Sequence, residues 1–190
     1  MVKQVFIING SGGVGKDSFI EKVRFAKSRI LIKSKDSKHI RICNYSSVSK
    51  VKKIAEIIGW TGTKTEKDRK FLSDLKLLTT EYNDMPLNDI KKYVNCVMNN
   101  NNNDDVIVFL HIREPEEIIK AANEFKEYGV KTILIKRDSV KHITSNMADE
   151  NVYNYKYDII VNNNGTLDEL EEKAERFIND CLVSNLKNLY

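Results

Sequence analysis

The sequence predicts an α/β protein: a three-layer sandwich in which a five-stranded parallel sheet lies between two layers of helices. Five short apolar runs alternate with amphipathic segments along the chain. The first of these runs, at about 3–9, has an unbroken apolar centre, which is typical of a strand covered on both faces. The chain has 190 residues, with no internal repeat and no interdomain linker, so we expect one domain over 1–190.

In the first half of the chain, capping residues and glycines mark the expected ends of the elements. Ser47 follows a weaker second strand and belongs to a residue type that caps helices, and Gly59 ends the helix that it would open. Thr65 and Asp68 have the spacing of a capping box at the start of the next helix. Apolar residues at strand or helical spacing complete the pattern: strands at about 3–9 and 39–44, and helices at about 15–28, 65–82 and 87–98.

The second half of the chain continues the alternation. Pro115 suits the first turn of a helix, and Gly129 ends that helix. Thr166 with Glu169 opens the last helix with a second capping-box spacing. Residues 138–156 show no periodicity, and an irregular insert of that length at the ligand edge of a sheet is typical of a mobile lid. The remaining elements are strands at about 106–110, 131–135 and 157–161 and a helix at about 116–128.

Composition restricts the partners and the location that we expect. Apolar residues make up 41% of the chain, and 31 Lys and Arg against 27 Asp and Glu give a formal charge of +4, too small to indicate a nucleic-acid polymer as partner. No apolar run approaches the roughly 20 residues of a membrane span. The first strand begins within a few residues of Met1, which leaves no room for a signal peptide, so we expect a cytoplasmic protein. We also expect a monomer or a homodimer. Cys43, Cys96 and Cys181 are expected to be reduced core residues.

The turn after the first strand carries the strongest motif. Gly10 and the pair Gly15-Lys16 match the pattern G-x-x-x-x-G-K between a strand and a helix, in which backbone N–H groups and the lysine bind phosphates. The residue after the lysine is normally Ser or Thr and binds Mg²⁺; here it is Asp17, a hard oxygen ligand, followed by Ser18. The nucleotide-binding candidates are therefore Gly10, Ser11, Gly12, Gly13, Val14, Gly15, Lys16, Asp17 and Ser18, with Asp17 and Ser18 as the metal candidates.

Other candidates leave the carboxyl ends of the strands, the edge at which parallel α/β sheets bind ligands. Arg113 follows the third strand, and its guanidinium fork matches phosphate geometry. Arg137 follows the fourth strand, whereas His111 alone is more often a packed or exposed histidine than a catalyst.

A basic cluster at the start of the 65–82 helix opposes the helix dipole. A bound anion would explain Lys64, Lys67 and Arg69 there, and a solvated basic face is the alternative. Trp60 would stack on a base or anchor the helix in the core.

Gly15-Lys16-Asp17-Ser18 resembles the phosphate loop of phage-type deoxynucleoside monophosphate kinases, and of animal-type phosphomevalonate kinases. The resemblance to the nucleotide kinases extends to His111–Glu117, where His111 replaces an acidic residue of the family, and to Asp158–Leu170. It implies a nucleoside monophosphate kinase-like P-loop fold, with ATP as donor and a phosphorylated small molecule as acceptor.

We therefore expect an ATP- and Mg²⁺-dependent phosphotransferase, with a (deoxy)nucleoside monophosphate as the favoured acceptor. A non-nucleotide acceptor such as phosphomevalonate, and a non-catalytic nucleotide-binding regulator, are the alternatives. A helical segment at about 45–98 would bind the acceptor and close with the lid over the site. In this hypothesis the catalytic residues are Lys16, Arg113 and Arg137, and the acceptor-binding residues are Trp60, Lys64, Lys67, Arg69 and Arg113.

Overall fold

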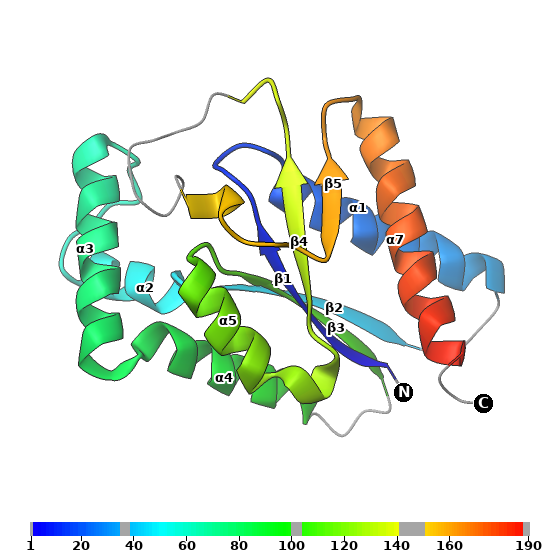
Figure 1. Cartoon of the computed structure of the whole chain (residues 1–190), viewed down its shortest axis with the longest axis horizontal. Coiled ribbons are helices and arrows are strands. Elements are labelled where there is room, and N and C mark those ends of the chain that lie inside the picture. The colour runs from blue at the N-terminus through cyan, green and yellow to red at the C-terminus, as the bar shows by residue number, and fades with distance from the viewer. Residues whose placement is uncertain (1, 35–38, 100–103, 141–150, 188–190) are drawn as a thin grey trace.

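Five parallel strands form one sheet in the order β2-β3-β1-β4-β5, so the predicted α/β fold class is confirmed. The structure is a computed structural model that describes residues 2–34, 39–99, 104–140 and 151–187. Its strands are β1 (Lys3–Asn9), β2 (Ile40–Ser46), β3 (Asp105–His111), β4 (Lys131–Lys136) and β5 (Ile159–Asn162). β1 is the central strand, so the phosphate loop that follows it leaves the middle of the sheet (Figure 1).

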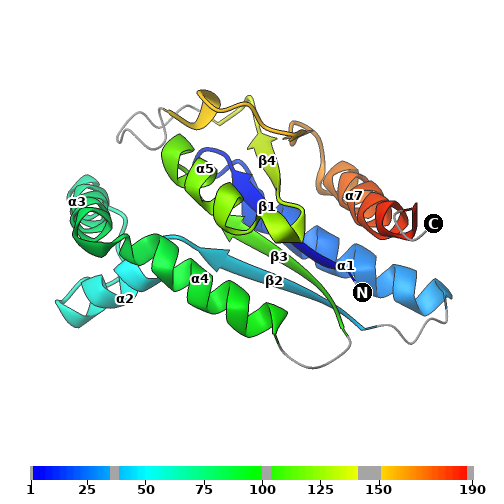
Figure 2. The ribbon, with the colours of Figure 1, turned by 60° about the horizontal axis from the view of Figure 1, so that its bottom comes forward.

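Helices cover both faces of the sheet, as the unbroken apolar strands require. On one face α1 (Lys16–Ser34) and α7 (Leu167–Lys187) pack around a cluster of aromatic rings; the rings of Phe6 and Phe177 lie 4.9 Å apart. On the other face lie α4 (Met85–Met98) and α5 (Pro115–Glu124) (Figure 2). They bury Val94 and Ile118 against the strands. The result is the predicted three-layer sandwich.

The expected acceptor-binding segment, about 45–98, forms α2 (Ser49–Ile57), α3 (Glu66–Asn83) and α4. Figure 1 shows α3 at one end of the molecule, beyond the sheet. The predicted capping box is present, because Thr65 and Asp68 bond reciprocally at the start of α3. The predicted cap at Ser47 is wrong: α2 begins after Val48 without a side-chain cap, and Ser47 is buried.

Three other features differ from what the sequence predicts: the covering of α3, the length of the helix after β3 and the burial of one cysteine. The apolar stripe of α3 is incompletely covered, since Leu78 and Tyr82 are exposed. The helix predicted over 116–128 is divided into α5 and the short 3-10 helix η1 (Lys126–Tyr128), which ends at Gly129. Of the three cysteines, all of them free, Cys181 is buried but Cys96 is exposed, which corrects the expectation that each lies in the core.

The predicted lid, about 138–156, has its middle part, 141–150, outside the described residues. Its described end forms the short 3-10 helix η2 (Asn151–Tyr153), and Val152 packs into the core on the α5 face. Within the described ranges, no helix has the length and apolar character needed to cross a bilayer.

Candidate active site

The turn between β1 and α1 has the shape of a phosphate loop because two glycines approach other strands closely. At Gly10, where φ is 144°, a Cβ atom would lie 2.5 Å from the carbonyl oxygen of Ile135. At Gly15, where φ is 97°, a Cβ atom would collide with the side-chain amide of Asn163. That amide donates to the carbonyl oxygen of Val14 at 2.8 Å. The loop is therefore shaped by β4 and by the turn after β5 as well as by its own sequence.

Lys16 opens α1 and its ammonium folds back over the loop. The Nζ atom donates to the carbonyl oxygen of Ser11 at 2.9 Å and to that of Gly10. These contacts hold a positive charge over the turn, beside the N–H groups at the start of α1. Lys16 thus lies where the sequence motif predicts, at the carboxyl end of the central strand.

Asn9, the last residue of β1, connects the loop to two other segments. It is completely buried, and its side-chain oxygen accepts from the backbone N–H of Gly10 at 2.8 Å. Its Nδ2 atom donates to the carbonyl oxygen of Arg113 at 2.9 Å and to the hydroxyl of Tyr157 at 2.6 Å. Tyr157 in turn donates to the carbonyl oxygen of Val152 at 2.8 Å. One amide therefore fixes the loop, the β3–α5 connection and the segment before β5.

His111 ends β3 next to the first turn of α1. Its Nε2 atom lies 3.7 Å from the Oδ1 atom of Asp17, too far for a hydrogen bond. This nitrogen is buried and has no hydrogen-bond partner in the described part of the chain. The Asp17 side chain, by contrast, is 86% exposed, as expected for a carboxylate that meets a ligand.

The charges around His111 make this edge of the sheet positive. Burial lowers the pKa of His111 to about 4, against the opposing effect of Asp17, and the positive charges of Lys16, Arg113 and Lys52 lower it further. The imidazole is therefore neutral at pH 7. Three cations and one carboxylate then act on one point, which suits a ligand carrying several negative charges. Arg113 is thus brought to the phosphate loop as predicted, together with Lys52 of α2, which the sequence did not indicate.

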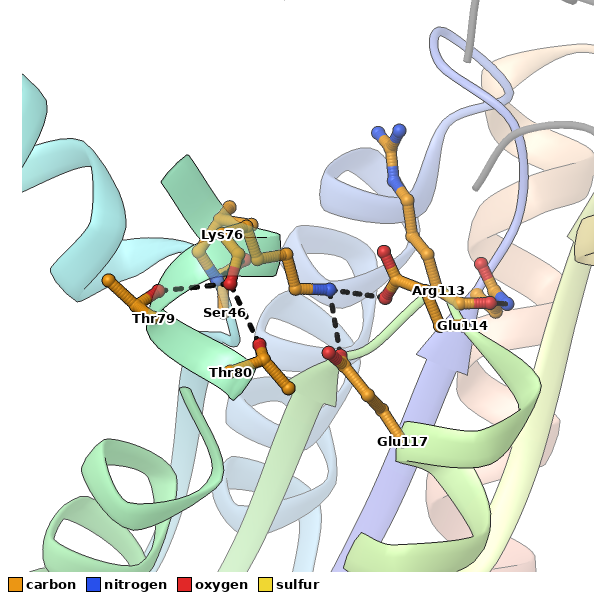
Figure 3. Close-up of polar contacts among 9 residues, drawn as sticks. Ser46, Lys76, Thr79, Thr80, Arg113, Glu114 and Glu117 are labelled. Atoms are coloured by element: carbon orange, nitrogen blue, oxygen red, sulfur yellow. Dashed lines mark hydrogen bonds and ion pairs between the residues drawn. The ribbon is translucent and has the colours of Figure 1, made fainter. Parts of the chain in front are cut away.

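A buried ion cluster links α3 to the end of β3. Lys76 of α3 donates to Glu114 and, at 2.7 Å, to Glu117, and its own carbonyl oxygen accepts from Thr79 and Thr80. Its side chain is only 9% exposed. Figure 3 shows Lys76 reaching from α3 to the two carboxylates, while the guanidinium of Arg113 points away from them.

Two carboxylates compete for this one ammonium, and their pKa values move apart. Burial raises the pKa of Glu117 to about 7, with the neighbouring Glu114 adding to the effect and Lys76 opposing it. For Glu114, the charge and hydrogen bond of Lys76 outweigh burial and hold its pKa below the usual range. Glu114 is therefore the ionised partner of Lys76, and Glu117 titrates near neutral pH.

The structure does not bring the predicted acceptor cluster to the phosphate loop. Lys64 and Lys67 are exposed at the start of α3, and the Nε atom of Arg69 donates to the carbonyl oxygen of Lys64 at 3.3 Å. The dipole argument for an anion there is wrong, because Glu66 and Asp68 supply negative charge in the same first turn. A role for the cluster in acceptor binding stays a prediction.

Trp60 and Arg137 are also placed without a defined ligand role. The Trp60 side chain is half-buried and lies outside the hydrophobic core, and its indole N–H donates to the carbonyl oxygen of Thr63 at 3.1 Å, so the expectation of a core anchor is wrong, whereas stacking on a base stays a prediction. Arg137 is exposed after β4, on the far side of β1 from the strand that carries Arg113.

No protein-family model matches the chain, and no curated protein matches it in sequence. Solved structures do match it over nearly its whole length. Shikimate kinase from Aquifex aeolicus covers 96% of this chain and 98% of its own, with 16% identity and a TM-score of 0.45. A gluconokinase from Sinorhizobium meliloti 1021 covers 99% and 96%, with 13% identity and a TM-score of 0.43. Identities this low assign no substrate, so the function is argued from the site itself.

Sequence reasoning missed four residues that shape the site: Asn9, Lys52, Lys76 and Asn163. Two of them had a local signal. Asn9 is a polar residue at the end of an otherwise apolar strand, and Lys76 lies four residues after Leu72 on the half-buried face of α3. The partners of Asn163 lie 149 residues away in the chain, and no local pattern points to them.

Proposed function

We propose that the chain is an ATP-dependent phosphotransferase that acts on a small phosphorylated acceptor. The observation that carries the proposal is that Lys16 and Arg113 lie at the same edge of the sheet, where both cations act on His111. Lys16 belongs to a loop that suits the phosphates of a nucleotide, and Arg113 comes from the neighbouring strand, with its backbone held to that loop through Asn9. A protein that only bound nucleotide would need the loop alone.

In this proposal each cation has a separate task. Lys16 leaves the loop carbonyls and donates to the outer phosphates of ATP, where it stabilises charge on the transferring group. Arg113 holds the phosphate of the acceptor and aligns it with the donor. An ionised phosphate is already a nucleophile at neutral pH, so alignment and charge stabilisation supply most of the catalysis. Closure of the helical segment would exclude water and limit hydrolysis of ATP.

The site has groups that suit a divalent cation beside the nucleotide. The exposed carboxylate of Asp17 and the hydroxyl of Ser18 are hard oxygen ligands in the first turn of α1, next to Lys16. Mg²⁺, when bound there, would neutralise phosphate charge. Asp17 would hold the cation, and Ser18 would complete the set of protein oxygens.

A panel of acceptors tests the proposal. Purified protein with ATP and a divalent cation is mixed with nucleoside and deoxynucleoside monophosphates, phosphomevalonate, shikimate and gluconate, and ADP formation is measured. We expect acceptor-dependent ADP formation with a phosphorylated acceptor, and with a nucleoside monophosphate first. Binding of ATP with no acceptor-dependent turnover would instead support a regulator.

Arg113→Ala separates the two halves of the site. Loss of a charge-assisted contact of about 1.5–3 kcal/mol should raise the acceptor KM or lower kcat by about one to two decades. Binding of ATP should change far less. If ATP binding collapses while acceptor kinetics hold, Arg113 belongs to the donor side and its proposed role is wrong.

A further inference from the structure

His111 and Asp17 stand next to each other at the point where the proposed nucleotide meets its cation. The Nε2 atom of His111 is 3.7 Å from the Oδ1 atom of Asp17, and it is buried without a hydrogen-bond partner in the described ranges. A buried polar atom without a partner is unfavourable unless a ligand satisfies it. Asp17 lies in the first turn of α1 and His111 ends β3, and both elements pack in the core, so the pair is held on rigid structure.

The separation of the two atoms suits two ligands of one small cation. With metal–ligand bonds of roughly 2.0–2.2 Å, two ligands lie about 3 Å apart at a right angle and about 4.3 Å apart when opposite each other. The observed 3.7 Å falls between these limits. Asp17 is the exposed member of the pair, so its carboxylate has room to adjust as the nucleotide enters.

The chemistry of this pair differs from that of an all-oxygen magnesium site. Mg²⁺ takes oxygen ligands and retains its water, whereas an imidazole nitrogen suits first-row transition metals. No group of three or more His, Cys, Asp and Glu side chains suited to a metal occurs among the described residues. The protein would therefore supply few ligands, and phosphate oxygens and water would supply the others.

We propose that His111 and Asp17 together ligate the cation that accompanies the nucleotide, and that this site prefers a first-row transition metal such as Mn²⁺ to Mg²⁺. The inference rests on the proposed function, because the nucleotide completes the shell. It follows that the metal binds weakly to the protein alone and tightly to the protein with nucleotide. The residue that follows the phosphate-loop lysine and the residue that ends β3 then form one functional pair.

Pulsed electron paramagnetic resonance on Mn²⁺ tests the pair directly. The full chain is loaded with Mn²⁺ and a non-hydrolysable ATP analogue, and electron spin-echo modulation reports nitrogen nuclei bound to the metal. We expect ¹⁴N coupling that changes to ¹⁵N coupling when only histidine is ¹⁵N-labelled. That change separates an imidazole ligand from the nitrogens of adenine or lysine, and it requires no variant.

Variants then assign the coupling to one histidine. His111→Asn should abolish it and lower the preference for Mn²⁺ over Mg²⁺, measured as the ratio of the two dissociation constants with the analogue, by about tenfold. The matched control is His39→Asn, since His39 is exposed before β2, and it should leave both unchanged. Thermal unfolding of each variant shows whether it is folded.

The outcomes separate this inference from the proposed function. Nucleotide binding without histidine coupling, or with the same coupling in His111→Asn, overturns the metal assignment and leaves the phosphotransferase proposal standing. Failure of the protein to bind nucleotide with either metal overturns the proposed function and the inference with it.

Discussion

The phosphate loop and the start of α3 are both clusters of unusual residues in the sequence, but they differ in which segments hold their side chains and backbone in place. The loop residues are held from outside the loop, by Asn9, Ile135 and Asn163. The basic residues at the start of α3 are exposed or bonded to their own turn, and Asp68 balances the helix end locally. A cluster that other segments hold in place is prepared to bind a ligand, whereas a cluster that satisfies itself need not be.

The largest expected effect tests the loop. Lys16→Ala should lower phosphoryl transfer by about two to three decades or more, because a positioned donor to the transition state is lost. The midpoint of thermal unfolding should hardly change, since the lysine is partly exposed and its ammonium donates to carbonyl oxygens of the loop itself. Lys126→Ala, at an exposed lysine on η1, is the control. Equal turnover in the Lys16 variant and the parent would remove the catalytic role of the loop.

The next largest effect concerns stability and sharpens the comparison within α3. Lys76→Met leaves Glu114 and Glu117 without their cation, and we expect a loss of about 2–3 kcal/mol in urea unfolding, less than for a fully buried pair because Glu114 is partly exposed. Lys70→Met removes a similar ion pair, with Asp74, that is exposed on the same helix. It should change stability by less than about 0.5 kcal/mol. Equal losses in the two variants would mean that burial of Lys76 adds nothing.

A smaller effect should appear in the dependence of stability on pH. The pKa of Glu117 rises from 4.5 to about 7 on folding, so folding favours its protonated form. This contribution is complete below pH 4.5 and is lost as the pH rises through 7. Glu117→Gln stays uncharged, and between pH 5 and 8 it should lose about 1–2 kcal/mol less stability than the parent.

Glu116→Gln, at the exposed neighbouring position, controls for the loss of one surface charge. Urea unfolding at several pH values makes the measurement. Glu114, whose pKa is held low, should stay ionised over this range and add no slope. Parallel stability curves for Glu117→Gln and the parent would show that Glu117 titrates as an ordinary glutamate.

The smallest expected effect belongs to the start of α3. Arg69→Ala should change the acceptor KM by less than about threefold, because Arg69 bonds to its own turn, away from the loop. The comparison is with Arg113→Ala under the same conditions. A rise of a decade or more for Arg69→Ala would show that α3 closes over the acceptor and that the basic cluster reaches it.

The sequence alone predicted those features that depend on neighbouring residues. The Thr65–Asp68 cap, the glycines of the loop and the apolar strands each follow from local spacing, and each is present. Lys76 escaped prediction because its burial depends on two carboxylates 38 and 41 residues away. The helix-dipole argument for an anion at the start of α3 failed because it left out Glu66 and Asp68 of the same turn, while the role of the basic cluster in acceptor binding stays a prediction. Charge patterns are therefore informative only when the nearest opposite charges are counted with them.

The dependence of the loop on distant residues also bears on how the site forms during synthesis. The motif lies in the first tenth of the chain, yet its shape rests on Ile135, Tyr157 and Asn163 in the last third. A chain that emerges from the ribosome N-terminus first therefore carries Lys16 long before the strands that shape the turn around it. Contacts of such long range form slowly, so a nascent chain should gain affinity for nucleotide only after β5 has been made.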